Sequence, residues 1–272
     1  MTIALLAVGE AMVDVVAAAP TDGGATHAPI RLRAGGTPVN AAVAAAALGA
    51  GAAVAARVGD DAAAAAIRHT LDAHGVTALL AVDDDLPTGV FVELGGTIVA
   101  ARGANDALSP DDLAGAPAHD ALLVSGYTFR AATAGTAAHC LHTSAGRWRA
   151  VDAGGVPAGA DTSGANVLLG TWDELREDGD VDPEALALRL LDRFEVVAVK
   201  LGPDGAVVAA DGRAVRLPAV LARSEGAVGA GDAFAAGLLV GLARDLDAPA
   251  ALALAQAAAA ERIRDREAAT RP

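Results

Sequence analysis

Residues 226–239 read Gly-Ala-Val-Gly-Ala-Gly-Asp-Ala-Phe-Ala-Ala-Gly-Leu-Leu. In this stretch a glycine-rich turn runs directly into an apolar helix, so several backbone N–H groups converge at a helix N-terminus. That arrangement suits an anion, particularly one whose charge grows in a transition state. Asp232 lies in the same turn, where a carboxylate is unfavourable unless it has a chemical role. One such role is to accept a proton from a hydroxyl nucleophile.

The same stretch has a simpler structural explanation. On spacing alone it is better explained as a glycine loop that starts a helix, with an ordinary aspartate near the cap. Two familiar nucleotide motifs are excluded. No Gly-Lys-Ser/Thr follows the loop, and a Gly-x-Gly-x-x-Gly fingerprint that starts at Gly229 would need glycine where Phe234 stands.

Outward from this stretch, short apolar runs alternate with alanine-rich amphipathic segments along most of the chain. The runs predict buried strands, and the amphipathic segments predict helices. This alternation predicts an α/β fold of three αβα layers, Rossmann-like, with a mostly parallel sheet covered on both faces. The predicted strands are 3–9, 53–58, 121–125, 149–152, 166–169 and 196–201, and the predicted helices are 39–48, 61–74, 131–144 and 183–192.

Two segments break the alternation. Residues 11–34 and 88–102 have strand-like patterns with no helix between the strands, which predicts a small antiparallel flap beside the main sheet. Ser109-Pro110 predicts the start of a further helix. Residues 261–272 carry many charges and predict a solvated helix end. No linker or repeat divides the chain, so we expect residues 1–272 to form a single domain.

Composition excludes several partners. The formal net charge is −14 and Lys200 is the only lysine, so the chain would repel a nucleic-acid backbone. Cys140 is the only cysteine, which excludes an intrachain disulfide and a cysteine-based zinc cluster. The first residues lack the basic start of a secretory signal, so we expect a cytoplasmic protein. The uncharged run 35–56 is mostly alanine and is interrupted by Asn40 and glycines, so we expect no membrane span.

A second glycine motif lies near the other end of the chain, where Gly35-Gly36-Thr37-Pro38-Val39-Asn40 precedes a predicted helix. Together with residues 229–234, it resembles the ribokinase-like (PfkB) sugar kinase family. That family has Gly-Gly-x-x-x-Asn near its N-terminus and Asp-Thr-x-Gly-Ala-Gly-Asp near its C-terminus. The resemblance covers nearly the whole chain, because further elements occur in family order: Gly9-Glu10 with Asp14, Val58-Gly59-Asp60-Asp61, Gly75-Val76, Pro87-Thr88-Gly89, Ser125-Gly126-Tyr127, and Lys200-Leu201-Gly202 with Gly205.

The resemblance implies roles for the matching positions. In the anion hole, the amides of Gly229, Ala230 and Gly231 would bind the transferred group, and Asp232 would deprotonate the attacking hydroxyl. Taken alone, Asp14 is better explained as a surface acid, and Asn40 as a helix cap. The residues that the resemblance assigns to sugar hydroxyls are Asp14, Gly35, Gly36 and Asn40.

The resemblance also implies ATP and Mg²⁺ as cofactors. Lys200, Gly202 and Gly205 would lie against the nucleotide, although the two glycines alone indicate only a turn between strands. Glu174 stands where the family's Asn-x-x-Glu element helps to organise magnesium. The flap matches the family's β lid, which covers the sugar and often mediates dimerisation, so we expect a homodimer through the lid.

Some positions depart from the family pattern. The family's Asp-Thr before Gly-Ala-Gly-Asp is replaced by Gly226-Ala227, followed by Val228, and the asparagine of the magnesium element is Thr171. Many relatives bind a monovalent cation with oxygens from this loop. Gly226 and Val228 offer no side-chain oxygen, so we expect no monovalent-cation site.

The expected function is therefore ATP-dependent phosphorylation of a hydroxyl of a monosaccharide, with a fructose-like sugar favoured. One alternative is a nucleoside kinase of the same family. It would need an aromatic-lined pocket, and the chain has only four Phe, two Trp and one Tyr. The other alternative is a degenerate relative that binds sugar without catalysis. The changes at Gly226 and Thr171 favour it, whereas the intact Asp232 disfavours it.

Overall fold

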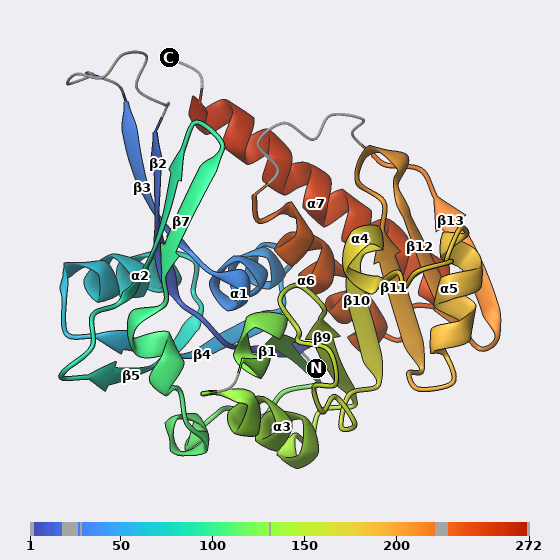
Figure 1. Cartoon of the computed structure of the whole chain (residues 1–272), viewed down its shortest axis with the longest axis horizontal. Coiled ribbons are helices and arrows are strands. Elements are labelled where there is room, and N and C mark those ends of the chain that lie inside the picture. The colour runs from blue at the N-terminus through green and yellow to red at the C-terminus, as the bar shows by residue number, and fades with distance from the viewer. Residues whose placement is uncertain (1–2, 18–26, 28, 131, 221–227, 271–272) are drawn as a thin grey trace.

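The computed structural model describes residues 3–17, 27, 29–130, 132–220 and 228–270, with side chains described as far as residue 266. Within these ranges the main sheet has nine strands in the order β13-β12-β11-β10-β9-β8-β1-β4-β5 (Figure 1). The strands from β11 to β5 pair in parallel, and β12 and β13 add an antiparallel edge. Their bounds are β1 Ala4–Val8, β4 Gly51–Gly59, β5 Thr77–Asp83, β8 Ala121–Ser125, β9 Trp148–Asp152, β10 Val167–Thr171, β11 Val196–Lys200, β12 Ala206–Ala210 and β13 Arg213–Leu217.

Helices cover both faces of this sheet. Alternate residues of β1 belong to different apolar clusters: Leu5 and Ala7 pack with α1, α2, α6 and α7, whereas Leu6 and Val8 pack with α3 and α5. The three-layer αβα fold predicted from the sequence is therefore confirmed. The helices are α1 Thr37–Ala47, α2 Ala62–Ala73, α3 Ala134–Thr143, α4 Trp172–Leu175, α5 Pro183–Leu190, α6 Ala230–Ala243 and α7 Ala248–Thr270, with 3₁₀ helices at Gly103–Ala107, Pro110–Leu113, Gly126–Phe129 and Gly202–Asp204.

A smaller sheet stands beside the main one, and its strands come from residues 11–34 and 88–102. It has the order β3-β2-β6-β7, from β2 Met12–Ala17, β3 Ile30–Gly35, β6 Gly89–Leu94 and β7 Thr97–Ala101. We refer to it as the lid; it projects from the body of the molecule (Figure 1). The lid is not wholly antiparallel as predicted. It consists of two antiparallel pairs, and β2 joins them by pairing with β6 in parallel.

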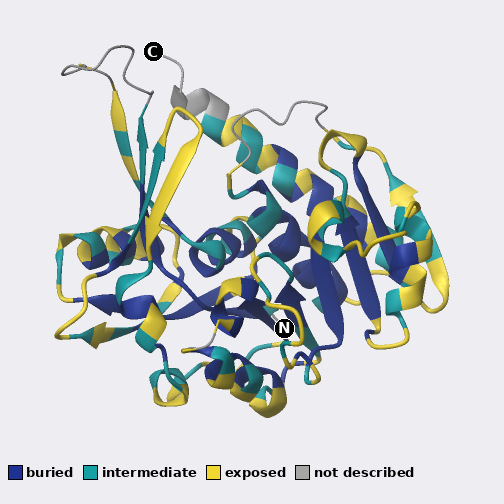
Figure 2. Cartoon of the chain, viewed as in Figure 1, coloured by how far each residue is buried: buried dark blue, intermediate teal, exposed yellow. Residues whose placement is uncertain are grey.

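The burial pattern separates these two sheets. The inner strands of the main sheet are buried, whereas its edge strands β5 and β13 and much of the lid are partly exposed (Figure 2). Among the described residues no helix has both the length and the apolar character that a membrane span requires.

Glycines bring the last two helices close together. A Cβ added at Gly237 would lie 2.7 Å from Ala255 Cα, and one added at Gly241 would lie 2.9 Å from Ala251 Cα. Side chains at these positions would push α7 away, so the glycines of α6 determine how near α7 lies. This contact positions the C-terminal turns of α7 beside the N-terminus of α6.

One local prediction was confirmed and another was wrong. A helix starts after Ser109 as predicted: it is the 3₁₀ helix Pro110–Leu113, with Ser109 as its N-cap. Asp112 accepts from the Ser109 N–H and pairs with Arg57 on β4. Residues 261–266 were expected to be solvated, but Arg262 and Arg266 are partly buried against the lid and α1 side of the molecule. Glu261, Arg264 and Asp265 follow the prediction and are exposed.

Candidate functional site

Asp232 lies in the first turn of α6, which begins at the predicted anion-hole residues. Gly229 is the N-cap and has φ 84, a left-handed conformation that glycine adopts without strain. Ala230 and Gly231 form the first helical positions, so their N–H groups are not used by the helix itself. Gly226 and Ala227, where the loop departs from the family pattern, lie outside the described residues; Val228 is described and exposed.

The carboxylate of Asp232 is held by Asn40 on α1. Asn40 Nδ2 donates a hydrogen bond of 2.8 Å to Asp232 Oδ2. Burial raises the pKa of the Asp232 carboxyl to about 6, and the charge of Asp152 adds to this, while the Asn40 hydrogen bond and Lys200 oppose it. At neutral pH the group is mostly deprotonated, yet it is more basic than an ordinary aspartate. These are the properties of a general base.

A cavity of about 430 Å³ lies between the lid and the N-terminus of α1. We refer to it as the lid cavity. Three of the four residues predicted to bind sugar contribute to its walls, and so does Asp232. The side chains around it are both polar and apolar: Glu10, Met12, Asp14, Gly36, Thr37, Asn40, Phe91, Ile98, Ala100, Arg102, Tyr127, Arg130, Val228 and Asp232.

The fourth predicted residue, Gly35, makes room for Asp14. A Cβ at position 35 would lie 2.3 Å from Asp14 Oδ1, so a side chain there would displace the carboxylate. Asp14 is buried, and burial raises the pKa of its carboxyl, while nearby Arg266, Arg262 and Arg33 oppose the shift.

Glu10 is a wall residue that the sequence marked only as part of the first strand motif. It is buried, and its Oε1 accepts hydrogen bonds from Ser125 Oγ at 3.1 Å and from Thr37 N at 3.3 Å. The second bond ties the start of α1 to the end of β1. Burial raises the pKa of this carboxyl, and the two donors oppose the shift.

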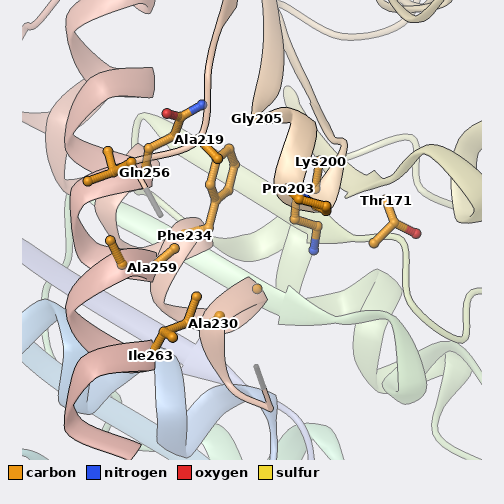
Figure 3. A pocket seen from close by; sticks show the side chains of 14 residues that line it. Thr171, Lys200, Pro203, Gly205, Ala219, Ala230, Phe234, Gln256, Ala259 and Ile263 are labelled. Carbon is orange, nitrogen blue, oxygen red and sulfur yellow. The ribbon is translucent and has the colours of Figure 1, made fainter. Parts of the chain in front are cut away.

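A second cavity, of about 250 Å³, lies on the other side of the same helical turn. We refer to it as the α6–α7 cavity. Lys200, Gly202 and Gly205, the predicted nucleotide residues, all line it. In Figure 3, apolar side chains from α6 and α7 face Lys200 and Pro203 across this space. Its apolar wall consists mainly of Val220, Phe234, Ala259, Ala260 and Ile263.

The two cavities meet at the first turn of α6. Ala230 and Gly231 line the α6–α7 cavity, whereas the next residue, Asp232, lines the lid cavity. The predicted anion hole is therefore at the boundary between two spaces of different character.

Lys200 pairs with Asp152 at this boundary. Lys200 Nζ is 3.2 Å from Asp152 Oδ2 and 3.4 Å from the position that a Cβ on Gly231 would take. Burial lowers the pKa of Lys200, but the charges of Asp152 and Glu174 outweigh it and raise the pKa overall. Asp152 was not predicted as a site residue. The sequence feature that could have identified Asp152 is its position: it is an acid at the carboxyl end of a buried parallel strand, where α/β proteins place ligand sites.

Glu174 and Asp152 bring two carboxylates together beside Gly154. Glu174 Oε1 and Asp152 Oδ1 lie 3.2 and 3.6 Å from the point where a Cβ on Gly154 would be. Glu174 Oε2 also accepts from the Thr171 N–H at 2.7 Å and so caps α4. Within the described ranges no three His, Cys, Asp or Glu residues form a metal cluster. Two neighbouring carboxylates nevertheless fit Mg²⁺, which keeps several waters and binds largely through substrate phosphates.

Two further arginines reach the site from α7, and the sequence analysis missed both. Arg262 Nη2 donates to Asn40 Oδ1 at 2.8 Å, and Arg266 Nη2 lies 4.0 Å from Asp14 Oδ2. Their spacing of four residues was the available signal, because it places both side chains on one face of a helix.

The fold and this site define a class of small-molecule kinases that have a covered parallel sheet, a β lid and a carboxylate beside a glycine-rich helix start. The chain belongs to the pfkB family of carbohydrate kinases, whose model matches residues 3–272. No curated protein has a significantly similar sequence.

Solved structures share the fold at low sequence identity. A ribokinase from Thermotoga maritima is 21% identical with a TM-score of 0.81, and the match covers 94% of this chain and 91% of that one. An adenosine kinase from Sinorhizobium meliloti is also 21% identical, with a TM-score of 0.78 and coverage of 96% and 93%. Arabidopsis thaliana ribokinase complexed with ribose and ATP is 23% identical, with a TM-score of 0.76 and coverage of 95% and 92%.

Proposed function

We propose that the protein is an ATP-dependent sugar kinase that phosphorylates a hydroxyl of a monosaccharide. The observation that carries this proposal is the position of Asp232. It lies where the lid cavity, with its mixed polar and apolar walls, meets the largely apolar α6–α7 cavity, directly after the N–H groups of Gly229 to Gly231. A base between an acceptor site and a nucleotide site is what phosphoryl transfer to an alcohol requires.

In the proposed reaction, the sugar occupies the lid cavity and hydrogen-bonds to Asp14, Asn40 and the backbone of Gly35 and Gly36. Asp232 accepts the proton of the sugar hydroxyl as its oxygen forms a bond to the γ-phosphorus of ATP. The bond between that phosphorus and the β–γ bridging oxygen breaks, and ADP leaves. The N–H groups of residues 229–231 donate to the oxygens of the transferred group, where charge accumulates.

On the nucleotide side, the proposal assigns the α6–α7 cavity to ATP. Lys200 faces the phosphates, Gly202 and Gly205 allow the backbone to approach the nucleotide, and the apolar wall suits the adenine ring. Mg²⁺, when bound, neutralises the phosphate charges. Glu174 and Asp152 would hold it, because their carboxylates lie close together beside Gly154.

We further propose that residues 1–272 act as one domain, that the lid closes over the sugar, and that its outer face forms a homodimer. Asp14 pairs across the lid with Arg33 and Phe91, so these three side chains share the inner face. The neighbouring residues along each strand point to the opposite, outer face of the lid. The paired residues on that face are apolar: Val15, Leu32, Val92 and Val99. Leu32 is 70% exposed and Val99 is 64% exposed, which is unusual for side chains of this size.

The walls of the lid cavity favour a sugar over a nucleoside. Phe91 and Tyr127 are the aromatic residues among its described walls. A nucleoside base would need more aromatic surface than these two rings supply. A nucleoside kinase therefore remains the second candidate, supported mainly by the fold shared with adenosine kinase.

A coupled ATPase assay tests the proposal directly. Purified protein with Mg-ATP would be offered fructose, ribose, tagatose, acidic sugars and nucleosides, and products would be identified by mass spectrometry. We expect a phosphorylated sugar, with one ADP formed for each sugar molecule that is phosphorylated. A nucleoside monophosphate would support the second candidate. Sugar binding without any ADP formation would instead indicate a non-catalytic relative.

A further inference from the structure

Two consecutive hydrogen bonds connect α7 to the proposed base. Arg262 Nη2 donates to Asn40 Oδ1 at 2.8 Å, and Asn40 Nδ2 donates to Asp232 Oδ2 at 2.8 Å. The three side chains come from α7, α1 and α6, so only the tertiary fold brings them together. The proposed function gives roles to Asn40 and Asp232 but none to Arg262, which is not among the described residues that line the lid cavity.

Arg262 determines which way the Asn40 amide faces. A guanidinium group only donates hydrogen bonds, so the Asn40 atom beside it must be the oxygen. The amide nitrogen then faces Asp232 and donates to its carboxylate. Asn40 is buried, so water does not compete freely for either bond. An amide that donates to a carboxylate stabilises the ionised form of the acid, which is the form that acts as a base.

Without the arginine, the amide would have a second stable arrangement. Once Asp232 has accepted a proton, its O–H can donate to Asn40 Oδ1 if the amide turns over. That bond would stabilise the neutral acid and raise its pKa. While Arg262 occupies Oδ1, the turned amide would direct its N–H groups at the guanidinium donors. Arg262 therefore excludes the arrangement that would retain the proton on Asp232.

Stability alone does not account for an arginine at this position. Arg262 Nε lies 3.1 Å from the position of a Cβ on Gly229, so the guanidinium group packs against the N-cap of α6. This Nε is buried and has no hydrogen-bond partner within the described ranges. A buried charged group with an unpaired donor is costly, and an apolar side chain of similar length would join α7 to α1 at lower cost.

Other charges also act on Asp232, but none of them depends on the direction of the amide. Burial raises the pKa of the carboxyl most strongly, and the Asn40 hydrogen bond opposes this. The charged groups that interact with Asp232 come from both cavities and from α7: Asp152, Glu10, Lys200, Arg262 and Arg266. The amide is the neighbour whose effect would reverse in sign if it turned over.

Resting on the proposed kinase function, we propose that Arg262 is a positioning residue that acts through Asn40 to keep Asp232 available as the base. It holds the amide N–H on Oδ2 before and after proton transfer. The proton of the sugar hydroxyl is therefore received at Oδ1, while the sugar oxygen forms its bond to phosphorus. Arg262 itself contacts neither sugar nor nucleotide in this role.

The first test replaces Arg262 by methionine, which removes the donors and the charge but keeps a long apolar side chain. NMR titration of protein with carbon-13-labelled aspartate carboxyls follows Asp232 directly, and Asp232→Asn identifies its signal. We expect the pKa of Asp232 to rise from about 6 to about 7, because a charged hydrogen bond contributes on the scale of a tenfold change in ionisation. The acid limb of kcat should move by the same amount.

Two further variants separate positioning from packing. Arg262→Lys also only donates, so it should return the pKa of Asp232 to near its original value. Arg264→Met is the control, because Arg264 lies on the same helix, is 51% exposed and pairs with Glu261. It should leave the titration unchanged. A lower unfolding temperature for Arg262→Met without a shifted titration would show a purely structural contact and overturn the proposal.

A double-mutant cycle tests whether the effect passes through Asn40. In an Asn40→Ala background, Arg262→Met should shift the titration of Asp232 no further. Additive shifts would show that the arginine acts by its charge alone, and they would overturn the proposal. If Arg262→Met does not fold, the Asn40 side-chain amide of the wild type decides. Its two N–H signals should stay separate above and below the pKa of Asp232, and their merging in acid would overturn the proposal.

The NMR titration needs no turnover, so this proposal and the kinase function fail separately. An unshifted pKa in Arg262→Met would overturn the positioning role and leave the kinase function intact. A shifted pKa in a protein that phosphorylates no sugar would support the hydrogen-bond chain and reject the kinase function.

Discussion

Asn40 and Asp232 lie 192 positions apart in the chain and are joined by a hydrogen bond of 2.8 Å. The Asn40 amide also accepts from Arg262, so both of its ends are engaged and its orientation is defined. This hydrogen bond holds Oδ2 of Asp232 in place. Because the carboxylate is rigid, the direction of its other oxygen, Oδ1, is then fixed as well. The two glycine motifs of the sequence meet in this bond, because α1 and α6 pack in the same apolar cluster.

Replacement of Asp232 by asparagine should abolish turnover. The change keeps the shape of the side chain but removes the base, and loss of a general base commonly lowers rates about 10²- to 10⁴-fold. Sugar affinity should remain close to that of the wild type. Measured kcat and calorimetric sugar binding test this, with Asp211→Asn in the exposed β12–β13 turn as control. A near-wild-type kcat would remove Asp232 from the mechanism.

Activity should decline in acid with an apparent pKa of about 6. Asp232 must be deprotonated to act, and burial raises its pKa to about 6, so the active fraction falls as the pH falls through this value. The Asn40 hydrogen bond opposes that rise. Asn40→Ala should therefore move the acid limb of kcat to higher pH. Profiles of both proteins at saturating substrate test this, and an unshifted limb in the variant would assign the titration to another group.

The lid should become protected when the substrate binds. Its strands β2, β3, β6 and β7 carry Asp14 and Phe91 on the face toward the lid cavity, and closure of such elements excludes water from phosphoryl transfer. Hydrogen exchange with and without the accepted sugar should show slower exchange in these strands. Nucleotide alone, which is assigned to the other cavity, serves as the control. Unchanged exchange in all four strands would count against lid closure.

The outer face of the lid should mediate dimerisation. Ile30 and Leu32 are 66% and 70% exposed, and they belong to the apolar face opposite Asp14. A lysine in place of Leu32 would put a charge into the proposed interface, where it would remain unpaired. Light scattering should show a dimer for the wild type and a monomer for Leu32→Lys. Lysine at the exposed Val181, far from the lid in sequence, is the control. A wild-type monomer at micromolar concentration would contradict the prediction.

Activity should not depend on potassium. The two loop positions that supply side-chain oxygens in many relatives are Gly226, which lies outside the described residues, and Val228, whose side chain is apolar. Potassium needs several oxygen ligands to replace its water. Initial rates in potassium and in tetramethylammonium at equal ionic strength should agree. Several-fold activation by potassium would refute this and would point to Ser224 or Glu225 as the substitute ligand.

The sequence by itself determined the layered fold, and it indicated most residues of the candidate site. Strand and helix periodicity depends on local side-chain patterns, and the main sheet follows from that alternation. The glycine at 229 is required by a local backbone conformation, so it could be recognised from a short stretch. Gly35 is required by contact with Asp14 on a different strand, and only its place in the motif marked it in the sequence. The order of the motifs then indicated which strands and loops would meet.

Other features were decided only by tertiary packing. The pairing of Asp152 with Lys200 and the partial burial of Arg262 and Arg266 were not predicted, although all four residues are visible in the sequence. At the charged end of a helix, the pattern of apolar residues does not show which face packs against the rest of the protein. That depends on how close α7 lies to α6, which Gly237 and Gly241 determine through contacts with Ala255 and Ala251. Because a helix behaves as a rigid body, the close contacts of α6 with α7 also fix the rotation of α7. They therefore decide in which direction Arg262 and Arg266 point.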